Sequence, residues 1–279
     1  MHVPDGFLDA STSLVTGTAA ATAVGLALRR AQQELDERTA PLAGLTAAFV
    51  FAAQMVNFPV GIGTSGHLMG GALAAVLVGP WTGVLCMSVV LLVQALLFAD
   101  GGLTALGTNI TLMAVVTVAA GWTGARVMLA LLPRRAASVV PAAAAGALLS
   151  VPAAAAVFVV LFAAGGQASL PLGALVATMM GWHTLIGIGE AVITGLTVSA
   201  VVAVRPDLVY AARGLRSSLR LRRADGSTVE VPAPAPAVTP GARSVLMGAG
   251  LVAVGVAGVL SFVASTQPDG LEYVAGTLG

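Results

Sequence analysis

Residues 138–164 read SVVPAAAAGALLSVPAAAAVFVVLFAA and contain no charged side chain. A helix of about 20 apolar residues crosses the hydrocarbon core of a bilayer, so this stretch is long enough to span a membrane. Comparable apolar stretches precede and follow it along the chain. The sequence therefore predicts a polytopic membrane protein with an all-α fold.

Short polar segments divide the apolar sequence into eight candidate spans. The spans cover residues 11–28, 41–59, 68–81, 82–99, 104–131, 138–164, 171–204 and 244–264. The third is short, and the seventh is long enough to contain a broken or re-entrant piece before His183. Prolines stand near several of the boundaries, where helices commonly begin or end.

Composition indicates the same class of protein. Hydrophobic residues make up 57% of the 279 and charged residues only 9%, and the mean hydropathy is +0.95, which is unlike an ordinary soluble domain. The net charge is +1, and no basic face suited to nucleic acid is present. The single cysteine, Cys86, lies in an apolar stretch, which excludes a disulfide framework and a thiolate metal cluster.

The basic residues are all arginines, and their positions predict the orientation of the chain. They follow the first span (Arg29, Arg30, Arg38), the fifth (Arg134, Arg135) and the seventh (six arginines from Arg205 to Arg223), and Arg243 opens the eighth. With an extracytoplasmic N-terminus, all of these fall on the cytoplasmic side, where arginine normally collects. Arg126 lies deeper, near the inner end of the fifth span, from which its side chain can reach the interface. The C-terminus is then also extracytoplasmic.

A linker separates the last span from the others. Residues 224–242 include Val231-Pro232-Ala233-Pro234-Ala235-Pro236 and predict an extended segment of polyproline character. The chain therefore divides into a membrane domain at 1–204, a cytoplasmic Arg-rich segment and linker at 205–242, and a terminal module at 243–279. That module holds one transmembrane helix and an external tail.

The chain begins Met1-His2, and a glycine-rich loop, Gly61-Ile62-Gly63-Thr64-Ser65-Gly66, ends at a second histidine, His67. A free terminal amine, the peptide nitrogen between residues 1 and 2, and the imidazole of His2 can chelate one metal ion through fused five- and six-membered rings. His67 can supply a fourth nitrogen from the same side of the membrane. Planar nitrogen coordination suits Ni(II) or Cu(II) better than Zn(II), and loss of the peptide proton makes the affinity rise with pH.

This site requires Met1 to keep a free amine. We expect Met1 to be retained, because removal of the initiator methionine generally requires a small second residue and His2 is large. No basic residue precedes the first apolar stretch, and Asp5 and Asp9 stand there instead, which argues against a signal peptide.

The glycine-rich loop has two other interpretations. It matches the dinucleotide-binding pattern G-x-G-x-x-G, but that motif requires a strand and a helix of a soluble βαβ unit, and here it follows a membrane span. It is also compatible with a plain connecting loop. Glycines that let the backbone bring His67 to the terminal amine remain the interpretation we favour.

Further polar residues are candidates for the surroundings of the metal ion: Asn57, Ser65, Asn109, His183 and Glu190. His183 and Glu190 are seven residues apart and so share one helical face. Ionisable residues inside a span are functional candidates, so the pair could relay metal or protons. We favour a structural role, in which they join helices through polar contacts.

The sequence lacks the motifs of two common enzyme classes. No Walker A motif is possible without lysine, and no H-E-x-x-H zinc motif occurs. The chain is therefore not expected to be an enzyme, and energy for moving an ion has to come from partner subunits.

Several blocks of sequence together resemble one family: Met1-His2-Val3-Pro4-Asp5-Gly6-Phe7-Leu8, Asn57-Phe58-Pro59-Val60, Gly63-Thr64-Ser65-Gly66-His67-Leu68-Met69-Gly70-Gly71, Gly79-Pro80-Trp81 and His183 through Thr194. They are similar to the CbiM/NikM substrate-binding (S) components of energy-coupling factor (ECF) transporters for cobalt and nickel, over residues 1 to about 204. The last span with Pro268-Asp269-Gly270-Leu271-Glu272 resembles the NikN/CbiN or PDGLE module. In this family that module usually has a second span after its external loop, and the sequence stops at Gly279.

The resemblance implies seven helices in the first module and a metal ion held by the Met1 amine, the His2 amide and imidazole, and His67. The ion, Ni2+ or Co2+, is the transported substrate, and no catalytic cofactor is implied. The implied partners are a transmembrane coupling (T) subunit and cytoplasmic ATPases, together with the lipid bilayer. The sequence of the glycine-rich loop resembles nickel-type members of the family more than cobalt-type members.

Two other classes of function remain as alternatives. In a structural or metal-sensing membrane protein without transport activity, binding would not depend on the terminal amine. In an intramembrane enzyme, His183 and Glu190 would act together, but they lack a nucleophile or a third ligand.

Overall fold

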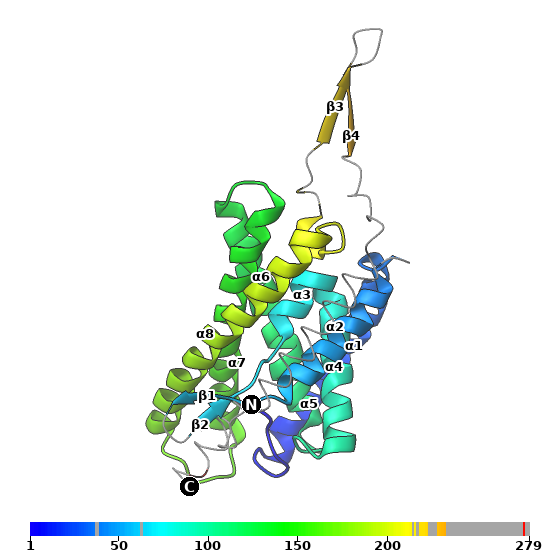
Figure 1. Cartoon of the computed structure of the whole chain (residues 1–279). Helices are drawn as coiled ribbons and strands as arrows, with labels where there is room; N and C mark the ends of the chain where they lie inside the picture. The colour runs from blue at the N-terminus through cyan, green and yellow to red at the C-terminus, as the bar shows by residue number, and fades with distance from the viewer. Residues whose placement is uncertain are drawn as a thin grey trace.

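The computed structural model describes residues 1–36, 39–61, 64–213, 215, 218–222, 228–232 and 276. Its main helices are α1 (Ala10–Arg30), α2 (Ala40–Gln54), α3 (Gly71–Val78), α4 (Pro80–Val93), α5 (Leu106–Asn109), α6 (Thr117–Leu131), α7 (Val139–Gly165) and α8 (Leu172–Val204). Short turns η1 (Ala31–Gln33) and η4 (Ala136–Ser138) lie between helices, and a third, η5 (Tyr210–Ala212), follows α8. Figure 1 shows these helices packed side by side in one elongated bundle.

Among the described residues, five helical segments are long and apolar enough to cross a membrane: Ala10–Gln33, Pro80–Phe98, Leu106–Leu131, Ala136–Gly165 and Leu172–Val204. Large apolar side chains, such as Leu14, Leu131 and Leu196, point outward from them and are mostly exposed. An outer surface of this kind matches lipid rather than water, so the prediction of a multi-pass helical membrane protein is confirmed.

The second and third predicted spans are shorter than expected. α2 ends at Gln54 because Asn57, Pro59 and Gly61 follow, and residues 58–61 pair as a strand instead. α3 has only eight residues and ends at Gly79, whose φ of 102° favours glycine. α8 is continuous, so the break considered before His183 does not occur. The predicted span at 244–264 lies outside the described residues.

In the described part of the chain, two short hairpins accompany the helices. β1 (Phe58–Gly61) pairs with β2 (Thr64–Gly66), and β3 (Ser218–Arg222) pairs with β4 (Thr228–Pro232), both antiparallel. The second hairpin differs from the linker expected at 224–242. Its strands alternate apolar and polar residues on either side of Asp225-Gly226, a pattern that favours a hairpin over polyproline conformation.

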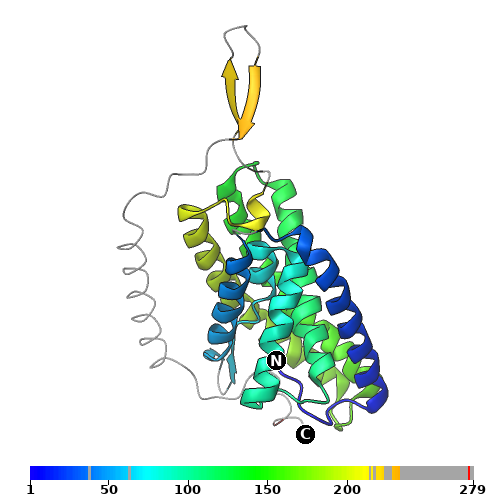
Figure 2. The same cartoon turned by 90° about the vertical axis from the view of Figure 1, so that its right-hand side faces the viewer.

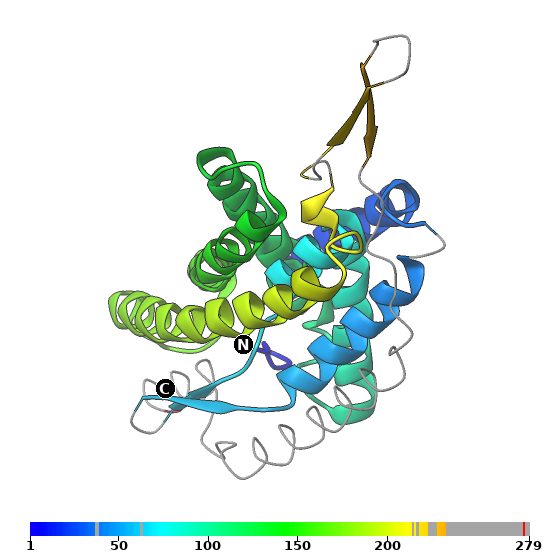
Figure 3. The same cartoon turned by 45° about the horizontal axis from the view of Figure 1, so that its top comes forward.

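The short helix α3 lies at the centre of the bundle. All eight of its residues are buried, and it contacts α2, α4, α6, α7 and α8. Viewed from above in Figure 3, α6, α7 and α8 lie to one side of it and α1, α2 and α4 to the other. α3 begins at Gly71, shortly after His67, so the buried central helix and the loop that carries His67 belong to one continuous segment.

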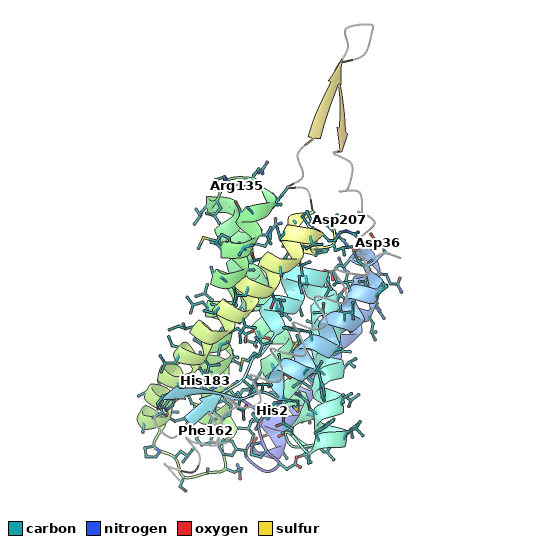
Figure 4. The ribbon with its side chains drawn as sticks, viewed as in Figure 1. His2, Asp36, Arg135, Phe162, His183 and Asp207 are labelled. Carbon is teal, nitrogen blue, oxygen red and sulfur yellow. The ribbon has the colours of Figure 1, made fainter. Side chains whose placement is uncertain are left out.

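The C-terminal ends of α1, α6 and α8 lie at one end of the bundle. Figure 4 shows Asp36, Arg135 and Asp207 at the end from which β3 and β4 project, whereas His2 lies toward the other end. The arginines that follow α1, α6 and α8 therefore lie apart from the N-terminal histidine, and the orientation of the chain in the membrane stays a prediction.

Packing between α6 and α7 depends on glycine. A Cβ atom on Gly146 would overlap the carbonyl oxygen of Gly121, which is backbone and cannot move aside. Gly146→Ala should therefore lower the free energy of unfolding by about 1–3 kcal/mol. Gly181→Ala in α8 is the matched control, because nothing lies within 4 Å of its Cβ position. It should be neutral or stabilising by about 0.5–1 kcal/mol through helix propensity. Thermal unfolding in detergent measures both, and equal effects would contradict this packing.

Candidate metal site

The first three residues of the chain are inserted into the bundle. Met1, His2 and Val3 are all buried, and Figure 2 shows the N-terminus among the helices. Val3 is held through its backbone: its N–H donates to Asn109 Oδ1 at 2.7 Å, and its carbonyl accepts from Asn109 Nδ2 at 3.1 Å and from Gly102 N at 3.0 Å. The amide side chain of Asn109 thus satisfies both backbone polar groups of a buried residue.

The terminal amine meets the histidine at the end of the glycine-rich loop. The Met1 nitrogen lies 2.7 Å from His67 Nε2, and both groups are buried. The other ring nitrogen, Nδ1, lies 3.0 Å from the Leu68 carbonyl, which can only accept. Nδ1 therefore carries the proton, and Nε2 presents its lone pair toward the amine.

This separation suits two ligands of one ion. Nitrogen ligands lie about 2.0 Å from a divalent first-row metal. Two such nitrogens at neighbouring corners of a square plane are then about 2.8 Å apart, from the same bond length. The observed Met1–His67 distance of 2.7 Å is close to this value, so both nitrogens could bind one ion with little movement.

His2 completes the group of nitrogen donors. Its ring stacks against that of His67, with centroids 5.2 Å apart and planes at 24°. Its Nδ1 lies 3.1 Å from Asp100 Oδ1, and its Nε2 lies 3.3 Å from Gln94 Oε1. Nδ1 is the nitrogen that closes a six-membered chelate ring with the His2 amide, so a metal ion would compete with Asp100 for it.

The backbone after His67 is held by a carboxylate from α8. Glu190, which is fully buried, accepts hydrogen bonds from Met69 N at 2.6 Å and Gly70 N at 2.8 Å. Gly70 has a φ of 82°, and a Cβ there would overlap the side chain of Val50. The carboxylate lies at the N-terminus of α3, where negative charge is favourable, and it fixes the loop that carries His67.

The other polar residues singled out in the sequence have different environments. Asn109 contacts Val3, next to His2. His183 is buried, and its Nδ1 donates to Met179 O, 2.9 Å away and one turn earlier in α8. Asn57 is half-buried and lies just before β1. Ser65 lies in β2, and its side chain is outside the described part.

Sequence reasoning missed Gln54, Gln94 and Asp100, all of which adjoin the site. Gln94 contacts His2, Gln54 contacts Gln94 and the Met69 carbonyl, and Asp100 contacts His2. The two glutamines could have been found as isolated polar residues near the ends of apolar spans. Within the described ranges, no three His, Cys, Asp or Glu side chains gather as a metal-binding group.

A family model for the cobalt uptake substrate-specific transmembrane region, CbiM, matches residues 2–208. The chain belongs to the CbiM family. A model for the PDGLE domain matches residues 243–278, so this CbiM protein carries the terminal module that its sequence predicted.

Relatives and solved structures agree with the CbiM assignment. A putative metal transport protein of Haloquadratum walsbyi is 40% identical over 210 residues, which is 75% of this chain and 94% of the relative. A putative fused nickel transport protein NikMN of Archaeoglobus fulgidus is 38% identical over 211 residues, 75% of this chain and 68% of the relative. A crystal structure of a truncated transition metal transporter has a TM-score of 0.65 and 31% identity, and the match covers 73% of this chain and 99% of that one. These are transport proteins rather than enzymes, which confirms the class predicted for this CbiM chain.

Asp5 helps to hold the inserted segment in place and gives a pH-dependent test of its docking. It accepts from the Thr104 hydroxyl and from Thr104 N, and the hydroxyl contact is the main reason that its pKa lies below the ordinary 3.8. A lowered pKa in the folded state adds stability at neutral pH, which is lost as the pH falls through that pKa. Asp5→Asn should therefore lower the Tm at pH 7, with the difference from wild type shrinking toward about pH 3. Thr104→Val should reduce the same pH dependence, and a difference independent of pH would contradict this assignment.

Proposed function

We propose that this CbiM-family chain is the substrate-binding membrane component of an importer for Ni2+ or Co2+, with Met1, His2 and His67 as the ligands of the transported ion. The observation that carries the proposal is the buried 2.7 Å contact between the Met1 amine and His67 Nε2. Stabilisation of the fold does not explain this contact, because a terminal amine at the protein surface would be solvated by water and would need no protein partner. When the Met1 and His67 nitrogens are neighbouring ligands in a planar metal site, metal binding explains why the chain's first residue is buried.

The ligand set consists of four nitrogens. The Met1 amine and the His2 amide close one chelate ring, the His2 amide and Nδ1 close a second, and His67 Nε2 occupies the remaining corner. Planar nitrogen donors with a deprotonated amide favour Ni(II), which agrees with relatives named as nickel transport proteins. Other relatives are named as cobalt transport proteins, so Co2+ belongs to the same proposal.

The chain acts as the S component of an ECF-type importer. The CbiM-like part, residues 1–204, forms a seven-helix bundle, and the PDGLE module adds one further transmembrane helix after the linker. Both termini are extracytoplasmic, which puts the metal ligands at the outer surface and the arginines at the inner one. ATP hydrolysis takes place in cytoplasmic ATPase subunits, and a transmembrane coupling (T) subunit transmits it, because the chain itself lacks a Walker A motif.

Adding one residue before Met1 tests the role of the terminal amine. The added peptide bond converts the amine into an amide and shifts the chelate out of register, so binding of Ni2+ should be lost. Calorimetric titration of purified protein with a native N-terminus provides the reference, and the same residue added after Gly279 provides the control. Unchanged affinity in the N-terminally extended protein, with helical content and Tm preserved, would rule the site out.

Histidine substitutions test which imidazoles bind the ion. His2→Ala and His67→Ala each remove one ligand and should weaken Ni2+ binding far more than His183→Ala, because His183 bonds within its own helix. Each variant is titrated with Ni2+ and assayed for cellular uptake together with the partner subunits. Loss of binding only in His183→Ala would move the site to α8. Normal binding without uptake in the wild-type complex would favour a metal-sensing role instead.

A further inference from the structure

We propose that Asp100 is the entry ligand of the metal site: its carboxylate receives the incoming dication from water and passes it to the chelating nitrogen of His2. The inference rests on the proposed function and assigns a role to a residue outside the four-nitrogen ligand set. It comes from the position of this carboxylate, which contacts a proposed ligand and also reaches the protein surface.

Asp100 lies beside the His2 nitrogen that the chelate requires. Its Oδ1 is 3.1 Å from His2 Nδ1. Two donors that bind one first-row ion at about 2.0–2.2 Å, at a right angle to each other, are about 3 Å apart. An ion between these two atoms therefore contacts both of them at once. Its passage from the oxygen to the nitrogen needs little movement of either side chain.

Exposure falls from Asp100 toward the nitrogen ligands. The Asp100 side chain is 36% exposed, whereas the His2 side chain is 7% exposed. Met1 and His67 are only 3% and 5% exposed. Figure 4 shows His2 toward the end of the bundle away from Asp207, which is the predicted outer side. Asp100 thus presents one anionic group both to the surrounding water and to the buried ligands.

An unusual turn holds Asp100 in this place. The π-helical turn η2 (Gln94–Phe98) is followed by Ala99, whose φ of 51° lies in the left-handed region, and then by Gly101 with a φ of 89°. The left-handed conformation is unfavourable for alanine, and such backbone outliers concentrate at functional sites. A Cβ on Gly101 would lie 3.4 Å from His2 Cβ, so the turn packs directly against the inserted segment. The fold keeps a costly conformation at the point where it brings a carboxylate to His2.

The transfer is an exchange of ligands. Carboxylate oxygen binds hydrated dications in general, whereas imidazole nitrogen suits Ni(II) better, so the ion gains by moving inward. The hydrogen in the contact between Asp100 and His2 belongs to Nδ1, because an ionised carboxylate can only accept. As the ion enters, that proton leaves to water, the bond from the metal to Oδ1 breaks and the bond from the metal to Nδ1 forms.

Substitutions at two aspartates separate a local role from a general effect of charge. Asp100→Asn keeps the shape and an oxygen acceptor for His2 but removes the charge, Asp100→Ser is a second neutral variant, and Asp100→Glu keeps the charge. Asp9→Asn is the matched control. It removes an equal charge from the start of α1, and asparagine is as good a helix N-cap as this aspartate, whose Oδ1 accepts from Thr12 N at 2.7 Å.

Kinetic measurements distinguish entry of the ion from its final binding. The protein is the full chain in a neutral detergent with a native N-terminus, and Ni2+ alone is the probe. Stopped-flow absorbance gives kon at low and at high salt, and transfer of the ion to excess EDTA gives koff. The d–d absorption spectrum reports the final ligand set, and thermal unfolding checks that each variant is folded.

We expect Asp100→Asn and Asp100→Ser to lower kon by about 10-fold at low ionic strength, as for the loss of an attracting charge at the mouth of a site. The difference from wild type should shrink at about 0.5 M salt, where such attraction is screened. koff should change less than kon, and the spectrum should stay that of wild type, because nitrogens hold the ion in its final place. Asp100→Glu and Asp9→Asn should keep a kon near that of wild type.

An unchanged kon in the folded neutral variants would overturn entry through Asp100 while leaving the metal site intact. An equal fall of kon in Asp9→Asn would also overturn it, since overall surface charge would then explain the effect. A changed spectrum in Asp100→Asn would make Asp100 a resident ligand and contradict the transfer. Failure of the wild type to bind Ni2+ would instead overturn the proposed function, and the entry route with it.

Discussion

The rest of the structure depends on burying the first peptide units of the chain. A terminal segment ordinarily stays in water, since its amide groups and its amine are strongly polar and costly to bury without partners. Here Asn109 satisfies both backbone groups of Val3, and His67 faces the amine. The rest of the bundle also contacts the inserted segment. The turn after η2 (Gln94–Phe98) contains Gly102, whose amide N–H donates to the Val3 carbonyl. Without these contacts, the inserted segment would lose more by desolvation than it gains in packing.

Two buried carboxylates tie the central helix to the surrounding ones. Glu190 of α8 accepts from the amides that open α3, on the side of His67. Near the other end of α3, Glu34 accepts from Trp81 N and Thr82 N at the start of α4, and a Cβ on Gly79 would overlap its carboxylate. Both exploit unsatisfied N–H groups at a helix N-terminus. The eight residues of α3 span about 12 Å, so one short rigid element connects the histidine loop to the arginine-rich half.

In the arginine-rich half of the bundle, the chain after α8 folds back on the helices. Arg213 donates to the Glu34 carbonyl at 2.7 Å and lies over the ring of Tyr210, which in turn packs against Trp122 of α6. The segment leading toward β3 and β4 is therefore fastened to the same corner that Glu34 holds.

Much of this arrangement could be predicted from the sequence, and the rest could not for identifiable reasons. Long apolar stretches specify helices such as α7 and α8, and the nitrogen donors of Met1 and His2 together with the histidine that ends the glycine-rich loop suggest a shared ion. The predicted lengths of the second and third spans were wrong, because hydropathy does not detect a helix that stops inside an apolar stretch. α2 stops in this way at Gln54, and α3 stops just before Gly79. Gln54 and Gln94 were missed because a lone glutamine has no spacing motif, and its role appears only when partners from distant segments meet.

With the proposed ligands, charge also balances at this buried place: the loss of one amide proton and the nearby carboxylate of Asp100 together offset a dication. An ion unable to displace the amide proton would keep an uncompensated charge in a low-dielectric site, so the same constraint that buries the terminus selects for metals that bind amide nitrogen.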